Sequence, residues 1–267
     1  MNISFIGAGN MASAIIKSII NSGRVSAGEI YVFDRDEKKM DELALLGVHK
    51  CNDLKDVCDS TNLILLAVKP QDYEALLVNI KSVTENLTSK TFISIAAGIS
   101  CDFVCKTLEC NVPVIRVMPN TPVMLGVGAT AISRNDLVSD KMYSKVCTMF
   151  AASGSVTSLS EDLMNKVICV NGSSPVYLYM LAKAMIDKAL EYGISEKNAN
   201  ELVYQTLKGS VEMLMKSGKT PDELIKMVAS PGGTTLAAIG SLENAGFYDT
   251  MSNAMDACTT RAEELSK

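Results

Sequence analysis

The segment that most constrains the fold of this chain lies at its beginning. An apolar run at residues 2–6 is followed at once by a glycine-rich turn and then by an apolar helical stretch at residues 14–20. The turn reads Gly7-Ala8-Gly9-Asn10-Met11-Ala12, the pattern G-x-G-x-x-A. The first glycine permits a tight turn, the second lets a pyrophosphate approach the backbone, and the small last residue lets the helix pack close to the strand. The N–H groups at the start of that helix favour phosphate, so the segment predicts a dinucleotide-binding βαβ unit.

Composition and charge exclude several other classes of protein. The chain has 267 residues, of which 48% are hydrophobic and 21% charged, a balance typical of globular domains. A net charge of −5 argues against nucleic-acid binding, which needs a basic face. The apolar run at residues 63–68 is much shorter than the roughly 20 residues of a membrane-spanning helix. The N-terminus has no basic segment before an apolar one, so we expect a cytoplasmic protein without membrane or nucleic-acid partners.

The eight cysteines do not suggest a metal site or a redox motif. None of them forms a C-x-x-C pair; the nearest spacings are Cys101-x-x-x-Cys105 and Cys105-x-x-x-x-Cys110. In a reducing compartment such residues behave as small buried hydrophobic side chains. We therefore expect neither metal nor disulfides.

The first 160 residues alternate short β-branched runs with helical stretches. Strands are predicted at residues 2–6, 29–34, 62–68, 91–95, 114–118, 127–132 and 155–159, and helices at 14–20, 37–46, 71–83, 101–108 and 140–150. The continuous apolar run at 62–68 is typical of a parallel strand buried on both faces. The alternation predicts an α/β fold, in which residues 1–160 form a Rossmann domain with a doubly wound sheet.

From residue 161 onward the pattern becomes helical. Apolar positions recur every three or four residues over 176–190, 197–215, 234–245 and 247–265. A further helix is expected to start at Thr220 and Pro221, a cap residue followed by proline. We expect residues 161–267 to form an all-helical domain, joined without a flexible linker. Its surplus of Leu, Met and Val predicts a homodimer through these helices.

Asp34 and Arg35, at the end of the second predicted strand, bear on the choice of cofactor. An acidic residue there accepts hydrogen bonds from the ribose hydroxyls of NAD and repels the 2′-phosphate of NADP. Arg35 would instead attract that phosphate. An alternative is that Asp34 only caps the helix that starts after Asp36. The residues alone leave both cofactors possible.

Two other strand ends carry polar residues where open α/β sheets place ligands. Lys69, before Pro70, is a candidate contact to a ribose or phosphate, or else an exposed lysine in a turn. Asn120 and Thr121 lie between Pro119 and Pro122 and offer hydrogen-bonding groups, or else form only a rigid turn.

The helical half contains a second candidate site. Ser230-Pro231-Gly232-Gly233-Thr234-Thr235 precedes a helix and exposes successive backbone N–H groups, which suit a carboxylate. Thr235 adds a hydroxyl that can bond a nitrogen or oxygen next to that carboxylate. Ser174 and Pro175 begin an earlier helix and are explained fully as a cap. The Ser230–Thr235 loop is therefore the stronger candidate.

The absence of a strong side-chain acid near these segments limits the chemistry. His49 is the only histidine and is interpreted as structural, and no serine–histidine–aspartate set or nucleotide-phosphate P-loop is present. Hydride transfer to a C=N bond needs no firm acid, because its nitrogen is basic enough to arrive protonated. Reduction of a carbonyl would call for a stronger proton donor.

Taken together, six segments resemble the pyrroline-5-carboxylate reductase family, over nearly the whole chain. They are Phe5-Ile6-Gly7-Ala8-Gly9-Asn10-Met11, Ala67-Val68-Lys69-Pro70, Ser94-Ile95-Ala96-Ala97-Gly98, Arg116-Val117-Met118-Pro119-Asn120-Thr121-Pro122, Gly172-Ser173-Ser174-Pro175-Val176-Tyr177 and Ser230-Pro231-Gly232-Gly233-Thr234-Thr235. The resemblance implies the last step of proline biosynthesis, in which 1-pyrroline-5-carboxylate is reduced to L-proline with NAD(P)H. It also implies an interlocked homodimer, often built into larger rings, with each site completed by a partner helix.

The resemblance also implies roles for individual residues. The pyrophosphate would lie on Ile6, Gly7, Ala8, Gly9, Asn10 and Met11, the adenosine half on Asp34, Arg35 and Asn52, and the nicotinamide half beside Ala67, Val68, Lys69, Pro70, Ala96, Ala97 and Gly98. The substrate candidates are Ser174, Ser230, Gly232, Gly233, Thr234 and Thr235, with Thr235 facing the ring nitrogen as the catalytic residue. Many relatives carry Ser or Thr, or a nearby basic residue, around position 34. Asp34 departs from that pattern and favours NADH, while Arg35 keeps NADPH possible.

Two rival interpretations have a specific weakness. A β-hydroxyacid dehydrogenase-like oxidoreductase calls for K-x-x-N early in the helical half, but Lys166 is followed three residues later by Cys169. A non-catalytic dinucleotide sensor would keep the glycine loop and add a partner surface. The acidic charge and the Ser230–Thr235 loop argue against the sensor.

Overall fold

The computed structural model describes residues 1–266 and contains two compact units. The first consists of Met1–Ser173 together with the residues from Cys258 onward, and the second of Ser174–Ala257. The first unit thus continues past residue 160, and the C-terminal end of the chain belongs to it. The expected division of the sequence into domains at residue 160 stays a prediction.

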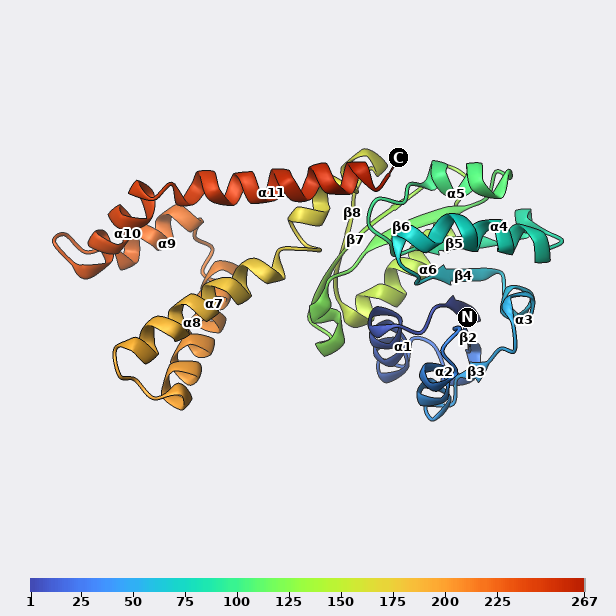
Figure 1. Cartoon of the computed structure of the whole chain (residues 1–267), viewed down its shortest axis with the longest axis horizontal. Coiled ribbons are helices and arrows are strands. Elements are labelled where there is room, and N and C mark those ends of the chain that lie inside the picture. Colours follow the sequence, from blue (N-terminus) through green and yellow to red (C-terminus); the bar gives the residue numbers. More distant parts are fainter. Residues whose placement is uncertain (267) are drawn as a thin grey trace. The chain divides into compact units, whose positions relative to one another are not determined.

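The first unit is built on a sheet of eight strands (Figure 1). The strands are β1 (Ile3–Ile6), β2 (Ile30–Phe33), β3 (His49–Lys50), β4 (Leu63–Leu66), β5 (Thr91–Ser94), β6 (Val114–Met118), β7 (Gly128–Arg134) and β8 (Gly154–Ser158). They lie in the order β3-β2-β1-β4-β5-β6-β7-β8. From β1 the chain adds β2 and β3 on one side, and it then returns to add β4 and the later strands on the other side. This is the doubly wound arrangement that the sequence predicts.

Helices cover both faces of this sheet. They are α1 (Asn10–Asn21), α2 (Glu37–Ala44), α3 (Leu54–Ser60), α4 (Tyr73–Val83), α5 (Cys101–Leu108) and α6 (Asp140–Phe150). Side chains of α1, α2 and α6 pack into one buried apolar cluster, and those of α3, α4 and α5 into another. Along β4, Leu63 and Leu65 belong to the first cluster while Ile64 and Leu66 belong to the second. A strand buried on both faces needs a continuous apolar run, as this sequence has.

The strand predicted at residues 127–132 is present as β7, but it runs antiparallel to β6. The connection between them holds only a short 3-10 helix, Thr121–Leu125. A parallel return would require a crossover of about a dozen residues or more. The short connection therefore fixes the reversed direction, and β8 then pairs in parallel with β7.

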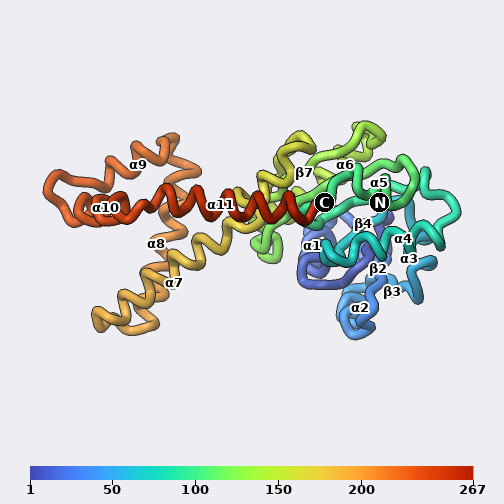
Figure 2. The backbone as a smooth tube through the Cα atoms, turned by 45° about the horizontal axis from the view of Figure 1, so that its top comes forward, coloured from blue at the N-terminus to red at the C-terminus, as the bar shows by residue number. Residues whose placement is uncertain are grey.

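The second unit is helical. It contains α7 (Pro175–Glu191), α8 (Glu196–Lys216), α9 (Pro221–Val228), α10 (Thr234–Asn244) and the start of α11 (Phe247–Glu264). Figure 2 shows α7 and α8 side by side as a hairpin, as does Figure 1. At α9 the predicted start is confirmed, because Thr220 and Glu223 form a reciprocal capping box ahead of Pro221. None of the helices in the described part of the chain has the length and apolar composition that crossing a bilayer requires.

All eight cysteines are free thiols, and four of them, Cys51, Cys58, Cys101 and Cys169, are buried. Burial is the main cause that raises the pKa of the Cys58 and Cys101 thiols, which keeps them protonated at neutral pH. The remaining four are partly buried.

A buried lysine closes the C-terminal end of α3. Lys90 is only 7% exposed, and its Nζ donates to the carbonyls of Cys58 (2.7 Å) and Thr61 (2.8 Å) and to Oδ1 of Asn62 (3.2 Å). A cation at this end satisfies carbonyls that have no partner inside the helix. We expect Lys90→Met to lower the free energy of unfolding by about 2 kcal/mol, because these acceptors would stay buried and unpaired. Urea unfolding measures the change, with the exposed Lys55→Met as control, expected within about 0.5 kcal/mol of the parent. Equal losses for both variants would contradict this role.

Candidate functional site

The predicted cofactor residues of the first unit gather at the carboxyl ends of its central strands. β1 lies between β2 and β4, and the chain leaves β1 toward opposite sides of the sheet. Such a switch point creates a crevice where open α/β sheets bind ligands. One candidate follows the end of each of four strands: Gly7 follows β1, Asp34 follows β2, Ala67 follows β4 and Ala96 follows β5.

The glycine loop has the shape that a dinucleotide requires. Gly7 has φ +105°, and its N–H donates to the carbonyl of Phe33 (2.8 Å). A Cβ on Gly7 would lie 2.6 Å from the carbonyl oxygen of Ala67, so no side chain fits there. A Cβ on Gly9 would meet nothing within 4 Å, which leaves open space beside the backbone. Gly9 is also the N-cap of α1 and offers no side-chain cap, so the residues present fit a pyrophosphate at this helix end.

Asp34 holds the glycine loop against the end of β2. Its Oδ2 accepts a hydrogen bond from the Ala8 N–H (2.6 Å), and its Oδ1 accepts one from the Asp36 N–H (2.8 Å). The cap of α2 is Asp36, whose side chain accepts from the Lys38 N–H. The alternative in which Asp34 caps this helix is therefore wrong. The sequence identified both Asp34 and Ala8 as cofactor candidates, but it did not indicate the hydrogen bond that joins them.

The other candidates for the adenosine half are exposed. Arg35 and Asn52 both lie at the surface, and the Asn52 amide donates to Oδ2 of Asp56 (3.1 Å). His49, interpreted as structural, bonds the carbonyl of Gly28 (3.0 Å) and stacks on Tyr31 with the ring centroids 4.9 Å apart.

Hydrogen bonds connect the end of β4 to β1 and to the end of β5. The Ala67 N–H donates to the Ile6 carbonyl (2.8 Å), which extends the pairing of β4 with β1. The hydroxyl of the fully buried Tyr73 donates to the Leu66 carbonyl (2.8 Å) and bonds Oγ of Ser94 (3.0 Å). Burial raises the pKa of Tyr73, so it remains a neutral donor. This link could not be predicted from the sequence, in which Tyr73 has only the pattern of an apolar helix residue.

Within this edge, the segments at residues 67–70 and 96–98 differ in exposure. Lys69 is exposed and precedes the short 3-10 helix Pro70–Asp72, whereas Val68 and Ala97 are partly buried. Ala96 and Gly98 are buried, and Gly98 has φ +81°.

The loop after β6 is a structural clamp. Oδ1 of the buried Asn120 accepts from the Ala129 N–H (2.9 Å). Nδ2 of Asn171 donates to the carbonyls of Met118 (2.8 Å) and Ala129 (3.0 Å). Both side chains join the end of β6 to the start of β7. This geometry favours the rigid-turn interpretation of Asn120.

In the second unit, the Ser230–Thr235 segment forms the predicted turn ahead of α10. Gly232 has φ +69°, and the Gly233 N–H donates to the Ser230 carbonyl (3.0 Å). Gly233 is the N-cap of α10 and, lacking a side chain, contributes no cap bond, so the first helical N–H groups, those of Thr234 and Thr235, point toward the open end. Ser174 is the N-cap of α7, but its side chain makes no cap bond there.

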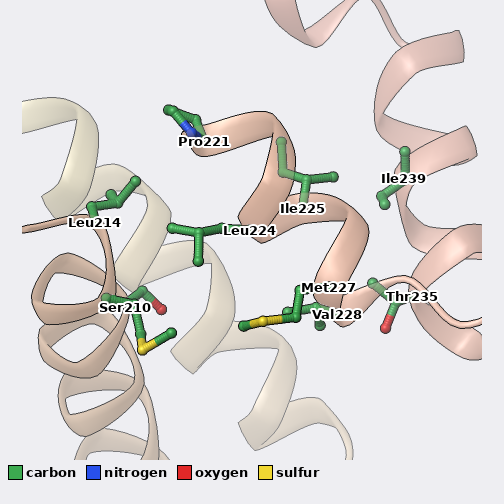
Figure 3. Close-up of a pocket in the computed structure, with 10 residues that line it drawn as sticks. Ser210, Leu214, Pro221, Leu224, Ile225, Met227, Val228, Thr235 and Ile239 are labelled. Atoms are coloured by element: carbon green, nitrogen blue, oxygen red, sulfur yellow. The ribbon is translucent and has the colours of Figure 1, made fainter. Parts of the chain in front are cut away.

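Thr235 lines an apolar groove between α8, α9 and α10 with a volume of about 470 Å³ (Figure 3). The groove is lined mainly by Met213, Leu214, Leu224, Ile225, Val228 and Ile239. Figure 3 shows Thr235 at the edge of this set, next to Val228 at the end of α9. The hydroxyl of Thr235 therefore stands at the border between an apolar surface and the turn.

Comparison with known proteins connects the two units to one family. The family model described as pyrroline-5-carboxylate reductase dimerisation matches residues 161–265, and the one described as NADP oxidoreductase, coenzyme F420-dependent, matches residues 2–98. Pyrroline-5-carboxylate reductase of Escherichia coli (strain K12) is 34% identical, covering 99% of this chain and 98% of the relative.

Solved structures agree with this relationship over the full length. The reductase of Coxiella burnetii is 31% identical, with a TM-score of 0.89 over 100% of this chain and 98% of the other. The Plasmodium falciparum pyrroline carboxylate reductase with NADP bound is 28% identical, with a TM-score of 0.92 over 100% and 98% of the two chains. The resemblance first seen in six short segments thus extends over both units, and the chain belongs to the pyrroline-5-carboxylate reductase family.

Proposed function

We propose that this chain reduces 1-pyrroline-5-carboxylate to L-proline with NAD(P)H. The observation that carries this proposal is the full-length relationship to reductases of that name, which includes both the glycine loop and the Ser230–Thr235 turn. The glycine loop supports the cofactor half of the proposal, because its geometry fits a pyrophosphate.

In the first unit, the residues divide among the parts of the dinucleotide. We assign the pyrophosphate to the loop from Ile6 to Met11, the adenosine ribose to Asp34 and Arg35, and the adenosine to Asn52. The segments at residues 67–70 and 96–98 flank the nicotinamide, since they follow β4 and β5 at the same sheet edge. The support is positional: the Ala8 N–H donates to the Asp34 carboxylate, and the Ala67 N–H donates to the Ile6 carbonyl.

In the second unit, the turn before α10 receives the substrate carboxylate. The N–H groups of Thr234 and Thr235 lie at a helix N-terminus, where the helix dipole also favours an anion. Ser230, Gly232 and Gly233 shape the turn, and Ser174 is a further candidate contact at the start of α7.

The chemistry requires orientation more than acid–base catalysis. Held beside residues 67–70 and 96–98, a dihydronicotinamide would supply a hydride to the imine carbon C5, and the C=N electron pair would pass to the nitrogen, which already carries its proton. The Thr235 hydroxyl bonds this nitrogen and keeps the ring in register with the carboxylate contacts.

Nucleotide oxidation tests this assignment directly. Purified protein should oxidise NADH or NADPH only when 1-pyrroline-5-carboxylate is added, and L-proline should accumulate in equal amount. A folded protein that binds dinucleotide without turning over this imine would redirect the proposal to another small substrate or to a sensor.

Asp34 should set the preference between the two nucleotides. We expect NADH to be used at least as well as NADPH, because the carboxylate repels a 2′-phosphate. Asp34→Ser should raise the ratio of kcat/KM for NADPH over NADH by about tenfold, the effect of removing roughly 1.4 kcal/mol of repulsion. The ratio is the proper readout, since freeing the Ala8 N–H loosens the loop for both nucleotides. Glu37→Gln, which removes a charge from the first turn of α2, should leave the ratio unchanged. A parent enzyme that strongly prefers NADPH would contradict this role of Asp34.

We also propose a homodimer formed through the helical unit, alone or as the building block of a ring. No residue of α7, α9 or α10 is fully buried, and large apolar side chains such as Met180 (67% exposed) and Met215 (73% exposed) lie at the surface. Exposed apolar area of this extent marks an interface. The match to a dimerisation family model supports the same conclusion. Analytical ultracentrifugation should give at least twice the mass of one chain at micromolar concentration; a folded monomer would refute the proposal.

A further inference from the structure

The C-terminal end of α11 lies directly on the loop that follows β5. Gly98, in this loop, has φ +81° and is buried. A Cβ on Gly98 would lie 2.8 Å from Cβ of Leu265, 3.0 Å from the Ala262 carbonyl oxygen and 3.1 Å from the carbonyl carbon of Leu265. Only glycine permits this approach, so the loop and the chain end fit each other closely.

Hydrogen bonds through Ser266 hold the turn that follows α11 in place. Nδ2 of Asn165 donates to Oγ of Ser266 (2.9 Å), and that hydroxyl donates to the Ala262 carbonyl (2.9 Å). Ala262 belongs to a small buried apolar cluster, against which Ala97 of the loop also packs. The contacts at Gly98 are therefore part of an ordered structure.

An ion pair between the buried Arg116 and the partly exposed Glu161 continues this set of contacts to the other end of the loop. Nη2 of Arg116, which is 3% exposed, donates to Oδ1 of Asn165 (2.9 Å), and its Nη1 donates to Oε1 of Glu161 (3.0 Å). Glu161 in turn accepts from the N–H of Cys101 (3.0 Å), the first residue of α5. The loop at residues 96–98 is thus covered by Leu265 on one side and anchored through Glu161 where α5 begins.

We propose that Leu265 and Ser266, in the turn that follows α11, are positioning residues for the nicotinamide half of the cofactor. They act through Gly98, because their contacts fix the position of the 96–98 loop relative to the ends of β4 and β5. An ion pair with a partly exposed carboxylate contributes little net stability, which makes positioning the better account of the Arg116–Glu161–Asn165 connection. This inference rests on the cofactor site proposed above and adds a role that its residues alone do not reveal.

A shortened chain tests the proposal by binding as well as by turnover. A chain ending at Glu264 loses Leu265 and Ser266, and a chain ending at Ser266 is its matched control. We expect the Kd for NADPH to rise at least about fivefold and kcat to fall about tenfold, because small displacements at a reacting group are costly. The Kd for 2′-phospho-ADP-ribose, which lacks nicotinamide, should stay unchanged. Equal weakening of both ligands, or of neither, would overturn the proposal.

A second pair of variants keeps the test valid if the shortened chain folds poorly. In the full-length protein, Ser266→Ala should weaken NADPH in the same direction, whereas Glu264→Ala removes only an exposed ion pair on the same turn and should change nothing.

A double-mutant cycle then tests the contact itself. Gly98→Ala carries the same backbone strain in the full-length and shortened chains, but only the full-length chain presents Leu265 to the new methyl group. The NADPH-binding penalty of Gly98→Ala should therefore be smaller in the shortened chain, and equal penalties would overturn the proposal. Failure of the proposed function would look different, because the parent chain itself would then neither bind NADPH nor reduce the imine.

Discussion

Replacing Gly7 by alanine is expected to weaken the binding of NADH and NADPH by at least about 100-fold, equivalent to roughly 2.7 kcal/mol. The added Cβ would lie 2.6 Å from the oxygen and 2.9 Å from the carbon of the Ala67 carbonyl, both backbone atoms. Ala67 is held to β1 by its hydrogen bond to Ile6, so a shift of Ala67 away from the new Cβ would break that bond. The loop must move instead, and it would displace the N–H groups that we assign to the pyrophosphate.

Two other glycines separate the causes of this loss. Gly23 also has a positive φ, +69°, but a Cβ there would meet nothing within 4 Å. Gly23→Ala should cost about 1 kcal/mol of stability through backbone strain and leave nucleotide binding unchanged. Gly9→Ala should weaken nucleotide binding and leave the stability nearly unchanged. A Cβ on Gly9 would meet no protein atom within 4 Å, but it would occupy the space proposed for the ligand. Isothermal titration with each nucleotide, together with urea unfolding, measures all three variants. An unchanged Kd in Gly7→Ala would remove the glycine loop from the cofactor site.

Removal of the Thr235 hydroxyl should lower kcat by about 100-fold, within the range found when one positioned hydrogen-bonding group is lost. Thr235→Val keeps the shape and the apolar contacts of the side chain at the groove, so the fold of the second unit should be preserved. The Kd for NADPH should not change, since the cofactor candidates lie in the first unit. The effect should therefore appear in turnover.

Thr235→Ser provides the matched comparison, because it retains the hydroxyl and loses only a methyl group. Steady-state kinetics with 1-pyrroline-5-carboxylate should place Thr235→Ser within a few-fold of the parent and Thr235→Val far below it. If the two variants had equal kcat values, the hydroxyl would have no part in the reaction.

Local signals allowed much of this fold to be predicted. The glycine loop, the apolar run of β4 and the helix cap at Thr220 each depend on neighbouring residues, and each is found where the sequence indicates. The direction of β7 was not foreseen, although the short connection after Met118 contained the information.

The contacts that shape the candidate site were harder to foresee, because they join distant parts of the chain. Ala8 meets Asp34, Tyr73 meets Ser94, and Arg116 meets Glu161 and Asn165. Neither partner in such a pair carries a local pattern that announces the other. Sequence patterns identified Asp34 and Gly98 as candidates, but only the structure shows what each of them holds in place.

The position of residues 258–266 in the first unit has a consequence for how the protein is made. The helical unit is an insertion, since the chain leaves the nucleotide-binding body at Ser173 and re-enters it at Cys258. A ribosome therefore releases the segment that covers Gly98 only after every strand of the sheet and the helical insertion have emerged. Chains fold progressively during synthesis. The first unit therefore cannot be completed until the helical insertion has been translated and the residues from Cys258 onward have emerged. The loop that follows β5 can therefore reach its final packing only after the helical insertion has been synthesised.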